Sequence, residues 1–201
     1  MKLYKFRPLK NTDHLERIKD IIKNGFYCCD FLKFNDMNEG VFTLNQKNFN
    51  IDLSEKQKYK VCSFSGKNAL NSQLMWGHYA NAGMGVVIEV DVSGGKYDQI
   101  KQVKYANSTD DLNTTEKILT HKSDEWKYED EFRYLSKGKT AYKVNIGEIA
   151  GIYFGTPYRK LANYDEIKDK HENLKKYLEL KGTLEKFCTE KGIRCQNYEF
   201  R

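Results

Sequence analysis

The sequence predicts an α+β fold. Short segments in which apolar and polar residues alternate recur along the chain and predict many short strands. A few segments with apolar residues at helical spacing lie among them in no regular order, whereas a doubly wound sheet needs strict alternation. Aromatic residues make up 13% of the 201 residues and supply large side chains for a core. We therefore expect one domain, residues 1–201, with a mixed or antiparallel sheet and peripheral helices.

The first elements are predicted to be a strand followed by a helix. Alternation over residues 2–7 predicts a strand that ends at Pro8. Asp13 and Glu16 have the spacing of a capping box, and an apolar stripe follows at helical spacing. Gly25 then stands where a helix would end.

The rest of the chain predicts further strands and three helical segments. Strands are expected at residues 26–30, 60–65, 85–91, 101–105, 131–135, 141–146, 149–155 and 192–200. Helices are expected at residues 71–80, at 109–120 and in a C-terminal helical segment over about 158–191. Gly182 is expected to interrupt that last segment.

Composition limits the class of protein. The net charge of +6 allows a polyanionic ligand such as nucleic acid without requiring one. No run of about 18 apolar residues is present, and the first ten residues lack the apolar core of a signal peptide. We therefore expect a cytoplasmic protein with no membrane partner. The five cysteines have no zinc-site spacing and are expected to be reduced.

An acidic cluster interrupts the strand predicted near residue 131. Glu129, Asp130 and Glu131 stand together where acidic residues are disfavoured. If the strand includes all of them, Glu129, Glu131 and Arg133 share one face. Clustered carboxylates can transfer protons or stabilise positive charge, and crowding raises the pKa of one of them. The alternative is a structural ion-pair network with Arg133 and nearby lysines.

Other polar residues interrupt apolar patterns. Arg7, at the end of the first strand, could bind a phosphate or a carboxylate through two hydrogen bonds, or be a solvated strand end. Ser63 and Ser65 share one face of their strand and could bind a sugar or an amide, although serines are common on an outer sheet face.

Three aromatic or imidazole residues lie in the helix predicted at 71–80. Trp76, His78 and Tyr79 precede a glycine-rich turn into the strand at 85–91. A lone histidine beside aromatic residues is most often structural. The four histidines are too scattered to predict a metal site.

Several of these motifs together resemble a known family. The stretches YKFRPL, FNDMNEG, VCSFS, LMWGHYANAGMGVVIEVD, WKYEDEFRYL and IYFG are similar, in this order, to the bacterial family catalogued as domain of unknown function 2971. The resemblance covers most of residues 1–155. It marks Asn35, Asp36 and Glu39, in the second motif, as candidates for substrate binding.

A second resemblance concerns the order of three motifs. An arginine on the first strand, Ser-x-Ser on a middle strand and Glu-x-Glu before a later one resemble the ADP-ribosyltransferases of the Arg-Ser-Glu class. That resemblance implies a sheet split around a central cleft that binds NAD, with no bound metal. The matching residues are Arg7, Ser63 with Ser65, and Glu129 with Glu131.

The resemblance also implies a role for each residue. Glu131 would stabilise the oxocarbenium ion that forms when nicotinamide leaves, and Glu129 would be the general base for the acceptor. Arg7 would bind the diphosphate or the nicotinamide ribose side. Ser63 and Ser65 would form the floor of the cleft. Three further residues would contact NAD, with Tyr79 or Trp76 stacking on nicotinamide and His78 beside them.

The sequence therefore supports three functional hypotheses. The first is an NAD-dependent ADP-ribosyltransferase, a toxin or anti-phage effector that modifies RNA, DNA or protein and is controlled by an antitoxin or inhibitor protein. The second is a nuclease with Glu39, Glu129 and Glu131 as metal ligands. The third is a non-catalytic module that binds nucleic acid or protein.

Overall fold

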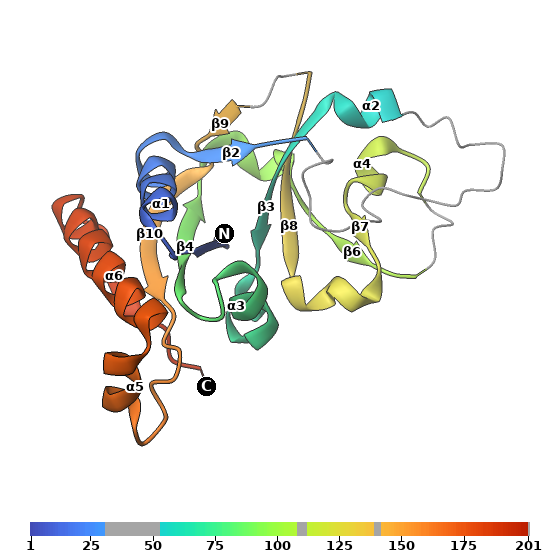
Figure 1. The fold of residues 1–201 in the computed structure, drawn as a ribbon. Helices are drawn as coiled ribbons and strands as arrows, with labels where there is room; N and C mark the ends of the chain where they lie inside the picture. Colours follow the sequence, from blue (N-terminus) through green and yellow to red (C-terminus); the bar gives the residue numbers. More distant parts are fainter. Residues whose placement is uncertain (31–52, 108–111, 139–141, 201) are drawn as a thin grey trace.

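The computed structural model describes residues 1–30, 53–107, 112–138 and 142–200. It shows an α+β protein with a mixed, mostly antiparallel sheet and several helices, which confirms the predicted fold class (Figure 1). The three residues predicted to bind substrate from the second motif, Asn35, Asp36 and Glu39, lie outside the described residues.

The elements have the following bounds. The strands are β1 (Lys2–Pro8), β2 (Phe26–Cys28), β3 (Tyr59–Ser65), β4 (Gly85–Val92), β5 (Ile100–Gln102), β6 (Lys104–Tyr105), β7 (His121–Lys122), β8 (Glu131–Lys137), β9 (Tyr142–Val144), β10 (Gly147–Phe154) and β11 (Cys195–Asn197). The α-helices are α1 (Thr12–Asn24), α2 (Leu53–Gln57), α3 (Gln73–Tyr79), α4 (Thr115–Ile118), α5 (Tyr164–Lys170) and α6 (Glu172–Glu190). The 3₁₀ helices are η2 (Lys67–Asn71), η3 (Gly94–Gln99) and η4 (Asp124–Glu129).

The main sheet has seven strands in the order β11-β10-β4-β1-β3-β8-β5. β1 pairs with β4 at seven positions, and β3 pairs with β8 at seven positions. Between β1 and β3 a single pair is registered, Tyr4 with Ser65. The sheet is therefore two well-paired halves joined by one residue pair, and β3 with β8 diverges from β4 with β10 in Figure 1.

Helices cover both faces of the first half of the sheet. One face packs against α1 and α6, and its buried cluster includes Leu3 of β1, Ile18 of α1 and Leu184 of α6. The other face packs against α3, where Phe6 of β1 contacts Trp76. Since neighbouring strand residues point to opposite faces, β1 contributes side chains to both clusters.

Of the two predicted boundaries of α1, the start is corrected and the end is confirmed. The N-cap of α1 is Asn11, whose side chain accepts a hydrogen bond of 3.0 Å from the amide of His14, so the capping box at Asp13 and Glu16 is wrong. The predicted end at Gly25 is confirmed, with φ of 88°.

In the C-terminal helical segment the interruption falls at His171, not at Gly182. His171 ends α5, and its Nδ1 caps α6 by accepting from the amide of Leu174 at 3.2 Å. Gly182 lies inside α6, and open space surrounds it.

Two other predicted elements differ from the structure. The strand expected at 101–105 is divided between β5 of the main sheet and β6, which pairs with β7. The described part of the helix expected at 109–120 is the single turn α4.

The strand expected at 131–135 is confirmed as β8, which starts at Glu131. Glu129 ends η4, and Asp130 adopts the left-handed conformation with φ of 45°. Glu129 therefore does not share a strand face with Glu131 and Arg133.

Within the described segments, no helix is both long enough and apolar enough to cross a membrane.

Gly85 allows the close approach of β1 and the turn before β4. A Cβ atom there would lie 2.5 Å from the carbonyl oxygen of Arg7 and 2.7 Å from that of Ala80. We expect Gly85→Ala to lower the free energy of unfolding by about 1–3 kcal/mol, measured by urea denaturation. Gly77→Ala is the matched control, because open space surrounds Gly77 inside α3. It should stabilise the protein by about 0.5–1 kcal/mol, and equal effects of both substitutions would contradict the argument.

Candidate active site

A cavity of about 260 Å³ lies where β1 and β3 separate. Beyond the pair of Tyr4 with Ser65, residues 5–7 of β1 and 61–64 of β3 line it from opposite sides. Residues of η4, β7 and β8 also line it. The cavity therefore exists because the two halves of the sheet share so little pairing.

The lining comes from both faces of the sheet. Tyr4 and Ser65 are paired and share a face, so Ser63 is on that face and Lys5 and Arg7 of β1 are on the other. The first face supplies hydroxyl and carboxylate groups, and the second supplies two cations. We call these the carboxylate side and the cation side of the cavity.

Most of the predicted site residues line this cavity. They are Arg7, Ser63, Ser65, Tyr79, Glu129 and Glu131. The structure thus gathers residues that are up to 124 positions apart in the sequence, from Arg7 to Glu131. It places Arg7 on the cation side and the other five with the carboxylates, so they do not form one cluster.

Trp76 and His78 do not line the cavity. Trp76 is 2% exposed, and its Nε1 donates to the carbonyl oxygen of Leu70 at 2.9 Å. Its ring stacks on Tyr198 and lies in the hydrophobic cluster that also contains Phe6 of β1. His78 is exposed, and its Nδ1 lies 3.2 Å from the hydroxyl of Tyr128. The structure therefore does not bring these two residues together with the other predicted site residues at this cavity.

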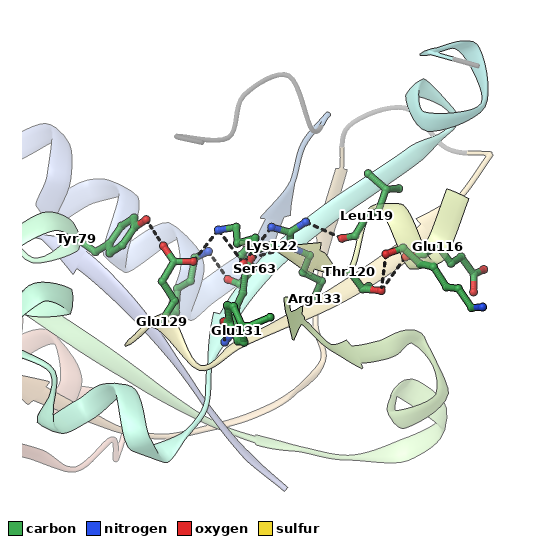
Figure 2. A network of polar contacts seen from close by, with 12 residues as sticks. Ser63, Tyr79, Glu116, Leu119, Thr120, Lys122, Glu129, Glu131 and Arg133 are labelled. Atoms are coloured by element: carbon green, nitrogen blue, oxygen red, sulfur yellow. Dashed lines mark hydrogen bonds and ion pairs between the residues drawn. The ribbon is translucent and has the colours of Figure 1, made fainter. Parts of the chain in front are cut away.

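The carboxylate side contains a buried network of charges. Glu131 Oε1 accepts from Arg133 Nε at 2.8 Å, and Oε2 accepts from Arg133 Nη2 at 3.0 Å. Lys122 Nζ lies 3.0 Å from Glu131 Oε2 and 2.6 Å from Glu129 Oε2 (Figure 2). All four side chains are buried, so the ion-pair network expected as the structural alternative is confirmed.

Neighbouring groups complete this network. Arg133 Nη1 donates to the carbonyl oxygen of Leu119 at 2.6 Å, and the hydroxyl of Tyr79 donates to Glu129 Oε1 at 2.5 Å. The Ser63 hydroxyl hydrogen-bonds to Glu131. Polar groups taken out of water need such partners, because an unpaired buried charge is very costly.

The two glutamates differ in proton affinity. Burial alone would raise the pKa of Glu131, but Arg133 and Lys122 hold it at about 2. Burial raises the pKa of Glu129, and the negative charge of Glu131 adds to the effect against the opposing charge of Lys122. The surroundings thus shift Glu131 toward its ionised form and Glu129 toward its protonated form.

The positive charges on the cation side have fewer compensating partners than those on the carboxylate side. The ammonium of Lys5 donates to the carbonyl oxygen of Ser63, and burial lowers the pKa of Lys5 and of Arg7. Across the described segments of the chain, no carboxylate forms an ion pair with either side chain. Lys5 and Arg7 are therefore cations without a carboxylate partner among the described residues, whereas the charges on the carboxylate side are paired.

The nuclease hypothesis needs Glu39, which lies outside the described residues. Glu129 and Glu131 are both bound to Lys122. Over the ranges that the structure covers, no three His, Cys, Asp or Glu side chains are grouped as metal ligands.

Lys5, Lys122 and Cys62 are site residues that the sequence analysis missed. Alternation along β1 places Lys5 on the same face as Arg7, which is a signal that could have identified it. Lys122 has no such signal, because β7 is two residues long and its position depends on its pairing with β6. Cys62 lines the cavity, whereas the sequence predicts only that it is reduced.

Comparison with protein-family models, with curated proteins and with solved structures finds no match to this chain. The two resemblances therefore stay predictions from the motifs. A functional proposal for this chain depends on the geometry and charges of the cavity.

The ion pair of Glu131 with Arg133 predicts the stability of a substituted protein. Glu131→Gln removes the charge that compensates the fully buried Arg133, so it should lower the free energy of unfolding by about 3–5 kcal/mol in urea denaturation. The matched control is Glu125→Gln in η4, because Glu125 is exposed. It should change stability by less than about 0.5 kcal/mol. A loss below about 1 kcal/mol for Glu131→Gln would contradict a compensated buried charge.

The pKa of Glu131 also predicts a pH dependence. Because the folded pKa is about 2 and the ordinary value is 4.5, its ionised form stabilises the fold above pH 4.5. That contribution is lost as the pH falls from 4.5 through 2. The stability difference between the natural protein and Glu131→Gln should be constant above this window and shrink within it. A difference that grows on acidification would show that the sign is wrong.

Proposed function

We propose that this chain is an NAD-dependent ADP-ribosyltransferase whose substrate binds in the cavity between β1 and β3. One observation carries the proposal: a single cavity combines two cations that have no carboxylate partner among the described residues with two carboxylates whose pKa values are shifted in opposite directions. NAD needs both, because its diphosphate is anionic and its nicotinamide ribose becomes cationic during bond cleavage.

The cation side is suited to the diphosphate. Arg7 can donate two parallel hydrogen bonds to phosphate oxygens, and Lys5 adds a second positive charge. Binding an anion would restore neutrality to a pair of cations that the described protein leaves without a carboxylate. The cavity of about 260 Å³ matches the nicotinamide ribose half of NAD better than the whole molecule. The adenosine would then extend outside it.

The carboxylate side is suited to the chemistry. Two carboxylates whose pKa values are moved apart by their surroundings can act one as a fixed charge and the other as a proton carrier. Glu131 stays ionised. In the complex, a ribose hydroxyl would take the place of the Ser63 hydroxyl as a hydrogen-bond donor to Glu131. Glu129 is held by Tyr79 and Lys122 and accepts a proton.

The reaction has two steps in this proposal. The glycosidic bond breaks, its electron pair leaves with neutral nicotinamide, and the ribose carbon becomes cationic beside Glu131. The acceptor then attacks that carbon and gives its proton to Glu129. The net charge of +6 is compatible with a polyanionic acceptor such as RNA or DNA and equally with an acidic protein surface. A toxin or anti-phage effector is the biological role that the motif resemblance favours.

The test is release and transfer from labelled NAD. We expect the purified protein to release nicotinamide and to transfer adenylate label to RNA, DNA or protein of a cell extract. Glu129→Gln should lower the rate by about 10²–10⁴-fold, as expected for loss of a general base. Arg7→Ala should weaken NAD binding by roughly 1.5–3 kcal/mol, measured as the loss of the NAD-induced rise in melting temperature.

Arg159→Ala is the matched control, because Arg159 is exposed and lies outside the cavity lining. Each variant is first compared with the natural protein by thermal unfolding without NAD. Absence of nicotinamide release, of transferred label and of any NAD-induced stabilisation would refute the proposal. Strongly salt-dependent binding of nucleic acid that Glu129→Gln leaves unchanged would favour a binding module. A requirement for divalent ions would favour a nuclease.

A further inference from the structure

Two thiols face each other across β2 and β3 on the cation side of the cavity. The amide of Cys29 donates to the carbonyl oxygen of Val61 at 3.0 Å, and the amide of Val61 donates back to Cys29 at 2.8 Å. This exchange of two bonds makes Cys29 and Val61 a hydrogen-bonded antiparallel pair. The preceding residue, Cys28, must then lie opposite Cys62 in a non-hydrogen-bonded pair.

The spacing of such a pair suits a disulfide. Cα atoms of a non-hydrogen-bonded antiparallel pair are about 4.5 Å apart, inside the range of about 4.4–6.8 Å that disulfides span. Both cysteines are free in this structure, and their thiols are in hydrogen-bond contact. Bond formation therefore needs little backbone movement.

The two thiols differ in their access to small molecules. Cys62 lines the cavity, whereas Cys28 is 0% exposed and does not line it. Cys62 is itself only 2% exposed, and of these two cysteines it is the one that borders the cavity, so a small oxidant there reaches Cys62 before Cys28. Cys28 contacts Cys62 through its thiol, which makes Cys62 its nearest reaction partner.

The charges around Cys62 favour its reactive form. Burial alone would raise the pKa of Cys62, but the hydrogen bond from Cys28 and the charges of Lys5 and Arg7 lower it to about 7. Glu131 of β8 opposes this effect from the other side. A thiolate is the nucleophilic form of cysteine, and cations next to a thiol activate it in this way.

We propose that Cys62 is an oxidation site for small hydroperoxides and that Cys28 converts the product to a cross-strand disulfide. The Cys62 thiolate attacks the outer oxygen of the hydroperoxide. The O–O bond breaks, and the alcohol or water leaves after taking a proton, so Cys62 becomes a sulfenic acid. The sulfur of Cys28 then attacks that of Cys62, the S–O bond breaks, and the proton of Cys28 leaves with the hydroxyl as water. Two thiols lose two electrons, and the hydroperoxide gains them.

This modification does not depend on the proposed transferase function. It replaces a thiolate beside Lys5 and Arg7 with a neutral disulfide, so the cavity becomes more cationic. It also joins β2 covalently to β3 at the cavity wall. An added thiol reductant reverses both effects.

The test is a peptide map after treatment with hydrogen peroxide. Cys188 and Cys195 form a second pair of contacting thiols, so the starting protein is the full chain with Cys188→Ser and Cys195→Ser. We expect loss of two hydrogen atoms and one linked peptide that contains Cys28 and Cys62. Dithiothreitol should restore both thiols. Cys28→Ser should instead accumulate a sulfenic acid at Cys62, which dimedone captures.

Cys29→Ser is the matched control, because Cys29 lines the same cavity but is paired with Val61. It should still form the linked peptide, and Cys62→Ser should leave Cys28 unoxidised. The proposal is overturned if peroxide oxidises Cys29 while Cys28 and Cys62 stay alkylatable. It is also overturned if the oxidised cysteines are never linked to each other. The map of the starting protein decides between these outcomes even where a variant fails to fold.

Discussion

The separation of β1 from β3 is the constraint on which the rest of the site depends. A strand that leaves its neighbour exposes backbone groups, and buried backbone groups need other partners. The amide and carbonyl of Val61 bond to Cys29, and the carbonyl of Ser63 accepts from the ammonium of Lys5. A side chain and a short neighbouring strand thus replace the missing ladder, and the space between the strands becomes the cavity.

The same separation explains why charged groups can be buried here. The two sheet halves leave room at the strand edges for Glu129, Lys122, Glu131 and Arg133, which neutralise one another at distances of 2.6–3.0 Å. The desolvation cost of such a group is offset only when every partner is in place. The network therefore holds η4, β7 and β8 together, and it fixes Glu129 and Glu131 in different electrostatic surroundings within one cavity.

Local patterns predicted most strands and the residues of the carboxylate side. Local sequence patterns identified β1, β3, β4, β8 and β10, and the i, i+2 spacing of Glu131 and Arg133 placed both on one face. The α1 cap was mispredicted because Asp13 has the residue type and spacing of a cap, while Asn11 lies closer to the helix start. The position of Lys122 at the cavity and the burial of Trp76 depend on contacts between segments distant in the sequence. Tyr198 stacks on Trp76 from 122 residues away, which no local pattern could indicate.

The buried charges also give the two halves of this protein different responses to heat. The cost of removing charges from water falls as temperature rises, whereas the stabilisation from apolar burial reaches a plateau. The half formed by β4, β10, α1 and α6 is held mainly by apolar contacts, and the half around β8 combines apolar contacts with the charged network. On warming, the charged network on the carboxylate side of the cavity thus contributes a growing share of the stability.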